Sequence, residues 1–118
     1  MKLIKKKKGT SKFYHLKSFL KRDFKGYFDI IFIFSVLGGI PQKKLDKVKK
    51  ILEILLKKNG IIFFIEMTGK HNIEGIWRTR TKEHYIQIFN NFRLTHKYFF
   101  EEDEGIFNLF YGKRKLKD

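Results

Sequence analysis

The sequence lacks cysteine, contains one proline and has no long apolar run. The absence of cysteine excludes disulfides and thiolate metal sites and is typical of a reducing compartment. The longest apolar stretches, 30–40 and 61–65, are much shorter than the roughly 20 residues that a membrane-spanning helix needs. The lysines in 1–8 are not followed by the apolar segment of a signal peptide. We therefore expect a soluble, cytoplasmic protein with no membrane span.

Apolar and aromatic residues are plentiful. Of the 118 residues, 42% are hydrophobic and 17% are aromatic, including 14 phenylalanines. This composition excludes a disordered chain, and the length allows one small domain with a single core.

Positive charge is concentrated at the beginning of the chain. Residues 1–25 contain ten Lys or Arg and one acid, and residues 26–118 contain seventeen and eleven, which together give the formal charge of +15. We interpret residues 1–25 as a basic tail and residues 26–118 as the domain. A solvated terminus is the favoured interpretation, and binding of phosphate backbones or another anionic surface is the alternative. The 22 lysines against 5 arginines disfavour readout of base edges.

Periodicity predicts the elements of the domain. A helix is expected over 11–22, where Phe13, Leu16 and Leu20 recur at helical spacing. Residues 28–35 and 61–65 have the continuous apolar character of strands covered on both faces. An amphipathic helix is expected between them, from Pro41 through Lys58, with Gly60 as its left-handed terminator. This unit predicts two parallel strands.

The second part of the domain is expected to begin with a long loop over 68–80. Thr81 is the predicted N-cap of a third helix. Residues 94–100 and 106–111 are strand-like and separated by a short acidic turn, which predicts an antiparallel hairpin.

The order of these elements resembles the second half of the class I S-adenosylmethionine-dependent methyltransferases. The run Tyr27-Phe28-Asp29-Ile30-Ile31-Phe32 is similar to the family's fourth strand, and Ser35-Val36-Leu37-Gly38-Gly39-Ile40-Pro41 is similar to the segment after it. The runs 55–62, 77–81 with 85–89, and 105–115 resemble three later segments of the family in the same order. The resemblance implies an α/β, Rossmann-like three-layer sandwich. Its partial sheet would have two parallel strands and a C-terminal antiparallel hairpin, with helices on both faces.

The family's glycine-rich cofactor turn is missing. Residues 1–26 contain no Gly-x-Gly motif after a strand, and residues 5–8 are not expected to form a strand. The resemblance therefore implies a truncated methyltransferase or a half-domain that uses S-adenosylmethionine. Whether this chain alone is active is left open.

The resemblance also implies where a cofactor would lie. By position in the family, Phe34, Ser35, Val36 and Leu37 would line it, although the same residues also suit a core and a turn. In this family methyl transfer is often achieved mainly by holding donor and acceptor in line, so no acid–base pair is required. The pair Gly38-Gly39 would allow a backbone or a ligand to approach closely.

Further candidates follow the second strand. Glu66 ends it and His71 lies on the loop beyond, so that either could orient an acceptor or act as a base; exposure to solvent without a role is the alternative. Trp77, Arg78 and Arg80 are candidates for binding an anionic or planar substrate. Packing of Trp77 against the third helix is the alternative. The histidines show no metal-ligand spacing, and no metal site is expected.

Three functions compete at this point. The first is a methyltransferase acting on a small-molecule acceptor, completed as a homodimer or by another chain through an exposed sheet edge. The second is a non-enzymatic basic α/β module that binds nucleic acid or another anionic partner, with nucleic acid not favoured. The third is a truncated reading frame without activity.

Overall fold

The computed structural model describes residues 2–7, 10–15, 24–103 and 105–115, with side chains from residue 24 onward. In chain order the elements are β1 (Lys2–Lys7), β2 (Thr10–His15), β3 (Phe28–Phe34), the 3₁₀ turn η1 (Leu37–Gly39), α2 (Gln42–Leu55), β4 (Leu56–Thr68), β5 (Asn72–Glu74), β6 (Trp77–Thr79), α3 (Lys82–Ile88), β7 (Phe92–Glu102) and β8 (Gly105–Arg114).

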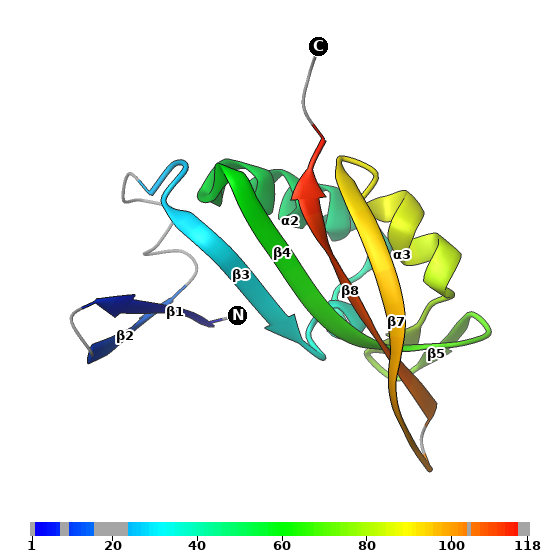
Figure 1. The fold of residues 1–118 in the computed structure, drawn as a ribbon. Helices are drawn as coiled ribbons and strands as arrows, with labels where there is room; N and C mark the ends of the chain where they lie inside the picture. Colours follow the sequence, from blue (N-terminus) through cyan, green and yellow to red (C-terminus); the bar gives the residue numbers. More distant parts are fainter. Residues whose placement is uncertain (1, 8–9, 16–23, 104, 116–118) are drawn as a thin grey trace.

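The central sheet has four strands in the order β3-β4-β8-β7 (Figure 1). Strands β3 and β4 are parallel, with Ile31 opposite Ile62 and Ile33 opposite Phe64. Strand β8 runs antiparallel to both β4 and β7. The predicted strand–helix–strand unit, the closing hairpin and the α/β fold class are confirmed.

Both helices contribute to one core on one face of the sheet. Leu45 and Leu52 of α2 and Tyr85 of α3 belong to the same buried cluster as Phe64 of β4 and Phe110 of β8. The described residues therefore form two layers. We expected helices on both faces of the sheet, whereas α2 and α3 pack on the same face. The cause lies in the connections, because α2 and α3 each follow a strand and return over the same side.

Strand β3 alternates between buried and exposed side chains. Ile31 and Ile33 are buried, whereas Ile30, Phe32 and Phe34 are 57%, 58% and 49% exposed. A strand covered on both faces was expected from the apolar run, and this strand is covered on one. We call the side that carries Ile30, Phe32 and Phe34 the uncovered face.

The basic tail contains an antiparallel hairpin. Strand β1 pairs with β2, with Leu3 opposite Tyr14 and Ile4 opposite Phe13. The predicted helix is therefore wrong for residues 11–15, and its remainder lies outside the described residues. The expectation that residues 5–8 are not a strand is wrong for 5–7. The pairing of β1 with β2 sets the backbone here, and helical periodicity in the sequence does not show such pairing.

Two boundaries also differ from those predicted. Helix α2 ends at Leu55 and β4 begins at Leu56, so Gly60 lies inside a strand and not at a helix terminus. A Cβ at Gly60 would lie 3.0 Å from the carbonyl oxygens of Lys57 and Phe28, so close backbone packing requires glycine there. The expected loop over 68–80 contains the short antiparallel hairpin β5–β6. No helix in the described part of the chain is long and apolar enough to cross a membrane.

Candidate functional site

The turn after β3 lies at the carboxyl end of the parallel strands, the position at which open α/β sheets bind ligands. Ser35 begins it with a left-handed φ of 52° and donates its backbone N–H to the Ile65 oxygen of β4 at 2.8 Å. The chain then passes through η1 to Pro41, which precedes α2. We call residues 35–41 the β3 turn.

Glu66 fixes the β3 turn from the neighbouring strand. Its Oε2 accepts the backbone N–H groups of Val36 at 3.0 Å and Leu37 at 3.1 Å, and its Oε1 accepts that of Gly38 at 3.1 Å. The side chain is fully buried. These three N–H groups have no other partner within the β3 turn, so the carboxylate satisfies donors whose burial would otherwise be costly.

Burial raises the pKa of Glu66 from its ordinary value of 4.5 to about 7. The backbone hydrogen bonds from the β3 turn and the positive charge of Arg80 lower it, and burial outweighs them because it removes the charged form from water.

Arg80 holds the other side of the β3 turn. It is fully buried, and its guanidinium donates to the carbonyl oxygens of Leu37 at 2.9 Å and Ile40 at 2.7 Å. Its Nε donates to Oε1 of Gln42 at 3.2 Å. The guanidinium lies 5.7 Å from the ring centroid of Tyr85. A planar fork with several donors suits this arrangement, because its acceptors lie on different residues.

The hairpin β5–β6 packs on the β3 turn through Trp77. Its indole occupies the space beside Gly38 and Gly39. The two glycines have no side chains, and this leaves room for the indole of Trp77 against the backbone of the β3 turn. Trp77 packs against η1, and its packing on the third helix stays a prediction. Arg78 donates to the oxygen of Ile76 at 2.9 Å within its own hairpin.

Buried polar residues gather at this end of the sheet. Asn108 faces Glu66 across β4 and β8, and its amide donates to the hydroxyl of Thr68 at 2.5 Å. The buried polar side chains of the described residues are Glu66, Thr68, Arg80 and Asn108. Sequence reasoning missed Thr68 and Asn108, although a lone polar residue inside the apolar run 106–111 was a usable signal.

The four predicted cofactor residues divide into two groups. The side chain of Leu37 is fully buried in the core and is not accessible to a ligand, whereas Phe34 is 49% exposed and Ser35 and Val36 are partly exposed. The N–H groups of the β3 turn that point toward Glu66 are occupied. Phe34, Ser35 and Val36 are thus accessible at the surface, and their contact with a cofactor stays a prediction.

His71 lies between β4 and β5 and is not among the described hydrogen-bond partners of Glu66. It is exposed, and its ring centroid is 6.4 Å from that of His84 at the start of α3. Burial lowers the pKa of His84, and the nearby charges of Arg80 and His71 act in the same direction. A cavity of about 350 Å³ at the start of α3 is lined by residues that include Thr68, Thr81, Glu83 and Asn108. The structure brings Glu66, Trp77 and Arg80 together around the β3 turn, and the functional roles predicted for all these residues remain predictions.

Comparison with solved structures identifies the fold. A SAM-dependent methyltransferase from Leishmania major superposes with a TM-score of 0.68 at 22% identity, over 75% of this chain and 39% of that one. A Burkholderia thailandensis 1,6-didemethyltoxoflavin-N1-methyltransferase, with 1,6-didemethyltoxoflavin and S-adenosylhomocysteine bound, gives a TM-score of 0.70 at 10% identity, over 80% of this chain and 47% of that one. A SAM-dependent methyltransferase from Archaeoglobus fulgidus gives 0.67 at 12%, over 82% and 64%.

The chain therefore has the class I SAM methyltransferase-like fold and spans less than two thirds of the length of these proteins. No family model and no curated protein matches the sequence.

Proposed function

We propose that this chain is part of an S-adenosylmethionine-dependent methyltransferase in which Phe34, Ser35 and Val36 form one wall of the cofactor pocket. The observation that carries the proposal is the fixation of the β3 turn by two buried charged side chains, Glu66 and Arg80. Such a scaffold holds a turn in one geometry at the sheet edge where this fold binds ligands.

When bound, S-adenosylmethionine supplies an electrophilic methyl group for transfer to a nucleophile. The part of this chain is to hold and orient. Phe34 and Val36 offer apolar contact and exclude water, and Ser35 offers a hydroxyl. Rigid positioning of donor and acceptor can supply most of the acceleration, so no acid–base pair is needed. Glu66 acts here as a positioning residue, because both of its oxygens face the backbone of the β3 turn.

A small-molecule acceptor is proposed. The Burkholderia neighbour is a didemethyltoxoflavin N1-methyltransferase. A second structural neighbour, human N-acetylserotonin methyltransferase, is also named after a small molecule. The β5–β6 hairpin packs on the β3 turn and carries Arg78, and we propose that this hairpin faces the acceptor, with His71 directly before β5. Trp77 and Arg80 support that hairpin and turn from within.

The remaining walls of the pocket require another polypeptide segment. Within the described sheet β3 is an edge strand, and its uncovered face carries Ile30, Phe32 and Phe34. We propose that a strand pairs with this edge, either from a second copy or from a complementing chain. The formal charge of +15 disfavours a second copy through mutual repulsion and favours an acidic complementing chain.

Ligand-induced stabilisation tests the proposal. Thermal unfolding is followed at increasing S-adenosylhomocysteine, and saturation at about 100 times Kd adds about 2.7 kcal/mol to the free energy of unfolding. Phe34→Ala is expected to reduce the shift. Phe99→Ala is the matched control, because Phe99 is 50% exposed and lies on β7, which is not adjacent to β3. No shift at millimolar ligand, or equal loss in both variants, contradicts a pocket wall at Phe34.

A further inference from the structure

A second cavity lies at the end of the sheet opposite to the β3 turn. It has a volume of about 550 Å³ and is formed where α2 ends and β3 and β4 begin. Five cationic side chains line it, together with a single acid, Glu53: Lys25, Lys50, Lys57, Lys58 and Arg114.

Among the described residues, the single acid forms no ion pair with these cations. Its carboxylate accepts the amide of Asn91 at 2.9 Å. Lys50 pairs with Asp46 at 3.2 Å and Lys57 with Asp29 at 3.1 Å, and all four side chains are more than half exposed. Exposed ion pairs of this kind contribute little to stability, so another anion can replace the aspartate as the partner of either lysine. Within residues 24–103 and 105–115, Lys25, Lys58 and Arg114 form no ion pair.

The four lysines of the cavity are not needed to cap α2. Its last carbonyls already accept hydrogen bonds: Ile54 from the N–H of Gly26 at 2.8 Å, Leu55 from that of Tyr27 at 3.0 Å, and Glu53 from Arg114 at 2.8 Å. The lysine ammonium groups therefore remain available to a ligand.

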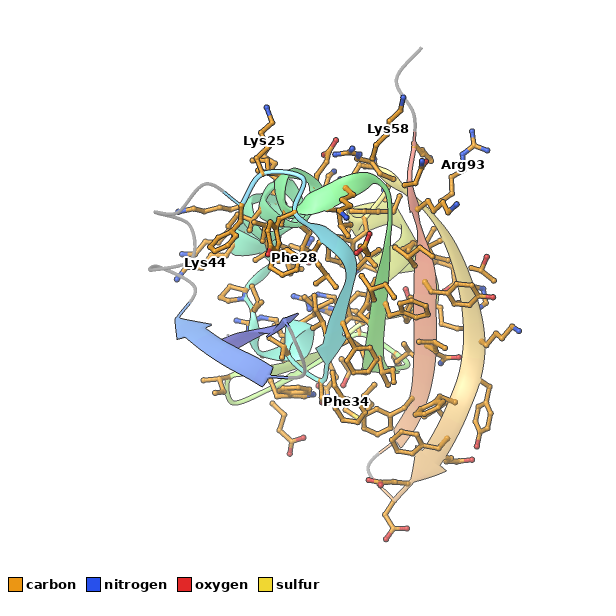
Figure 2. All side chains as sticks on the ribbon, turned by 60° about the vertical axis from the view of Figure 1, so that its left-hand side comes forward. Lys25, Phe28, Phe34, Lys44, Lys58 and Arg93 are labelled. Carbon is orange, nitrogen blue, oxygen red and sulfur yellow. The ribbon has the colours of Figure 1, made fainter. Side chains whose placement is uncertain are left out.

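The positive charge continues beyond the cavity. Arg93 and Lys113 are cross-strand partners on β7 and β8, and Lys115 follows Arg114. Figure 2 shows Lys25, Lys58 and Arg93 spread along one end of the molecule, with Phe34 toward the other end. We call the five cavity cations together with Arg93, Lys113 and Lys115 the basic edge. A row of cations suits a chain of phosphates better than one compact anion.

An exposed aromatic ring adjoins the lysines. Tyr27 is 39% exposed and follows Lys25 and Gly26 directly. Edge-to-face contacts with Phe24 at 5.3 Å and Phe28 at 5.1 Å support its ring. Gly26 has a left-handed φ of 60°, and a Cβ there would meet nothing within 4 Å, so the space beside this turn is open. A supported ring among cations is the arrangement on which unpaired bases stack.

We infer that the basic edge binds single-stranded nucleic acid, with its lysines on the phosphates and Tyr27 against a base. Lysine makes point-charge contacts, so the binding is expected to show little sequence preference. This function is independent of methyl transfer, because the basic edge and the β3 turn lie at opposite ends of the sheet.

Two charge-matched variants of the full chain test this inference. Lys25→Glu/Lys58→Glu alters the basic edge, and Lys43→Glu/Lys44→Glu makes the same change in net charge at the exposed start of α2. Anisotropy of a labelled single-stranded RNA of about twelve nucleotides is measured over a range of salt concentrations. With two phosphate contacts removed, the slope of log K against log salt is expected to fall by about 1.4 in the first variant and to stay unchanged in the second.

Tyr27→Ala tests the contribution of the aromatic ring without changing the net charge. Affinity is expected to fall between about fivefold and a hundredfold with the salt slope unchanged. Circular dichroism confirms that each variant is folded.

Two results overturn the inference. Equal losses in the two charge variants would assign binding to diffuse charge, including that of the basic tail. Displacement of the RNA by polyglutamate as effectively as by unlabelled RNA would assign the basic edge to an acidic polypeptide.

Discussion

The indole of Trp77 lies where a side chain at Gly38 would have to be, since a Cβ at Gly38 would come within 2.7 Å of its Cε2 and Cζ2 atoms. This contact joins the β5–β6 hairpin to the β3 turn. The turn is therefore held from three directions, by Glu66, by Arg80 and by Trp77.

Gly38→Ala is expected to destabilise the protein by about 1–3 kcal/mol, because the added methyl group overpacks a filled site. Gly39→Ala is the control, since a Cβ there would lie 3.7 Å from the same indole, an ordinary contact distance. Urea unfolding midpoints measure both. A Gly38→Ala variant as stable as Gly39→Ala would contradict the packing described.

Arg80→Lys is expected to cost about 2–4 kcal/mol, because one ammonium group cannot reach the oxygens of Leu37, Ile40 and Gln42 together. Arg78→Lys serves as the comparison, since among the described residues the guanidinium of Arg78 donates to Ile76 of its own hairpin and not to the β3 turn. Equal free energies of unfolding for the two variants would show that Arg80 does not hold the β3 turn.

The stability of the protein is expected to depend on pH through Glu66. Its pKa is about 7 in the folded state and about 4.5 as the ordinary value, so the folded state binds the proton more tightly. The stabilising contribution of Glu66 is therefore full below pH 4.5 and is lost as pH rises through 7, by about 3 kcal/mol in total.

Glu66→Gln is expected to remove this fall, which urea titrations at a series of pH values would measure. His84 acts in the opposite direction, because its lowered pKa destabilises the folded state as pH falls below 6.5. The difference between wild type and Glu66→Gln cancels that term. Glu74→Gln, at an exposed position, is expected to keep the wild-type profile. Parallel profiles for wild type and Glu66→Gln would refute the assignment.

Association along β3 is expected to depend on the uncovered face. Ile30→Lys is expected to weaken self-association, or capture of a complementing chain, by at least tenfold, because pairing would bury the added charge. Ile73→Lys is the control, since Ile73 has the same exposure of 57% and lies on β5. Sedimentation velocity over a concentration series measures self-association, and equal behaviour of the two variants would exclude the β3 edge.

Much of the fold was predictable because local signals and tertiary packing agree. The apolar runs over 28–34 and 61–65 form strands, the lysine-rich helix between them is amphipathic, and Thr81 accepts the N–H of His84 at 3.0 Å as an N-cap. The start of β4 was missed because residues 56–58 continue the helical pattern, whereas in the fold Leu56 already pairs with Phe28 of β3.

The candidate site was predictable in place and less so in role. Glu66 was recognised as ending an apolar strand, but sequence alone could not show that its carboxylate faces three backbone N–H groups about thirty residues earlier. The same holds for Arg80, whose acceptors lie roughly forty residues away.

By itself, the sequence determined the parallel pair with its helix, the closing hairpin, the excess of positive charge and the resemblance to class I methyltransferases, because each depends on residue type and local spacing. Only the tertiary structure decided that Glu66, Trp77 and Arg80 converge on one turn, that one face of β3 is uncovered, and that eight cations lie along one edge. Those relations join residues distant in the chain, and they exist only once the sheet has paired and the helices have packed on it.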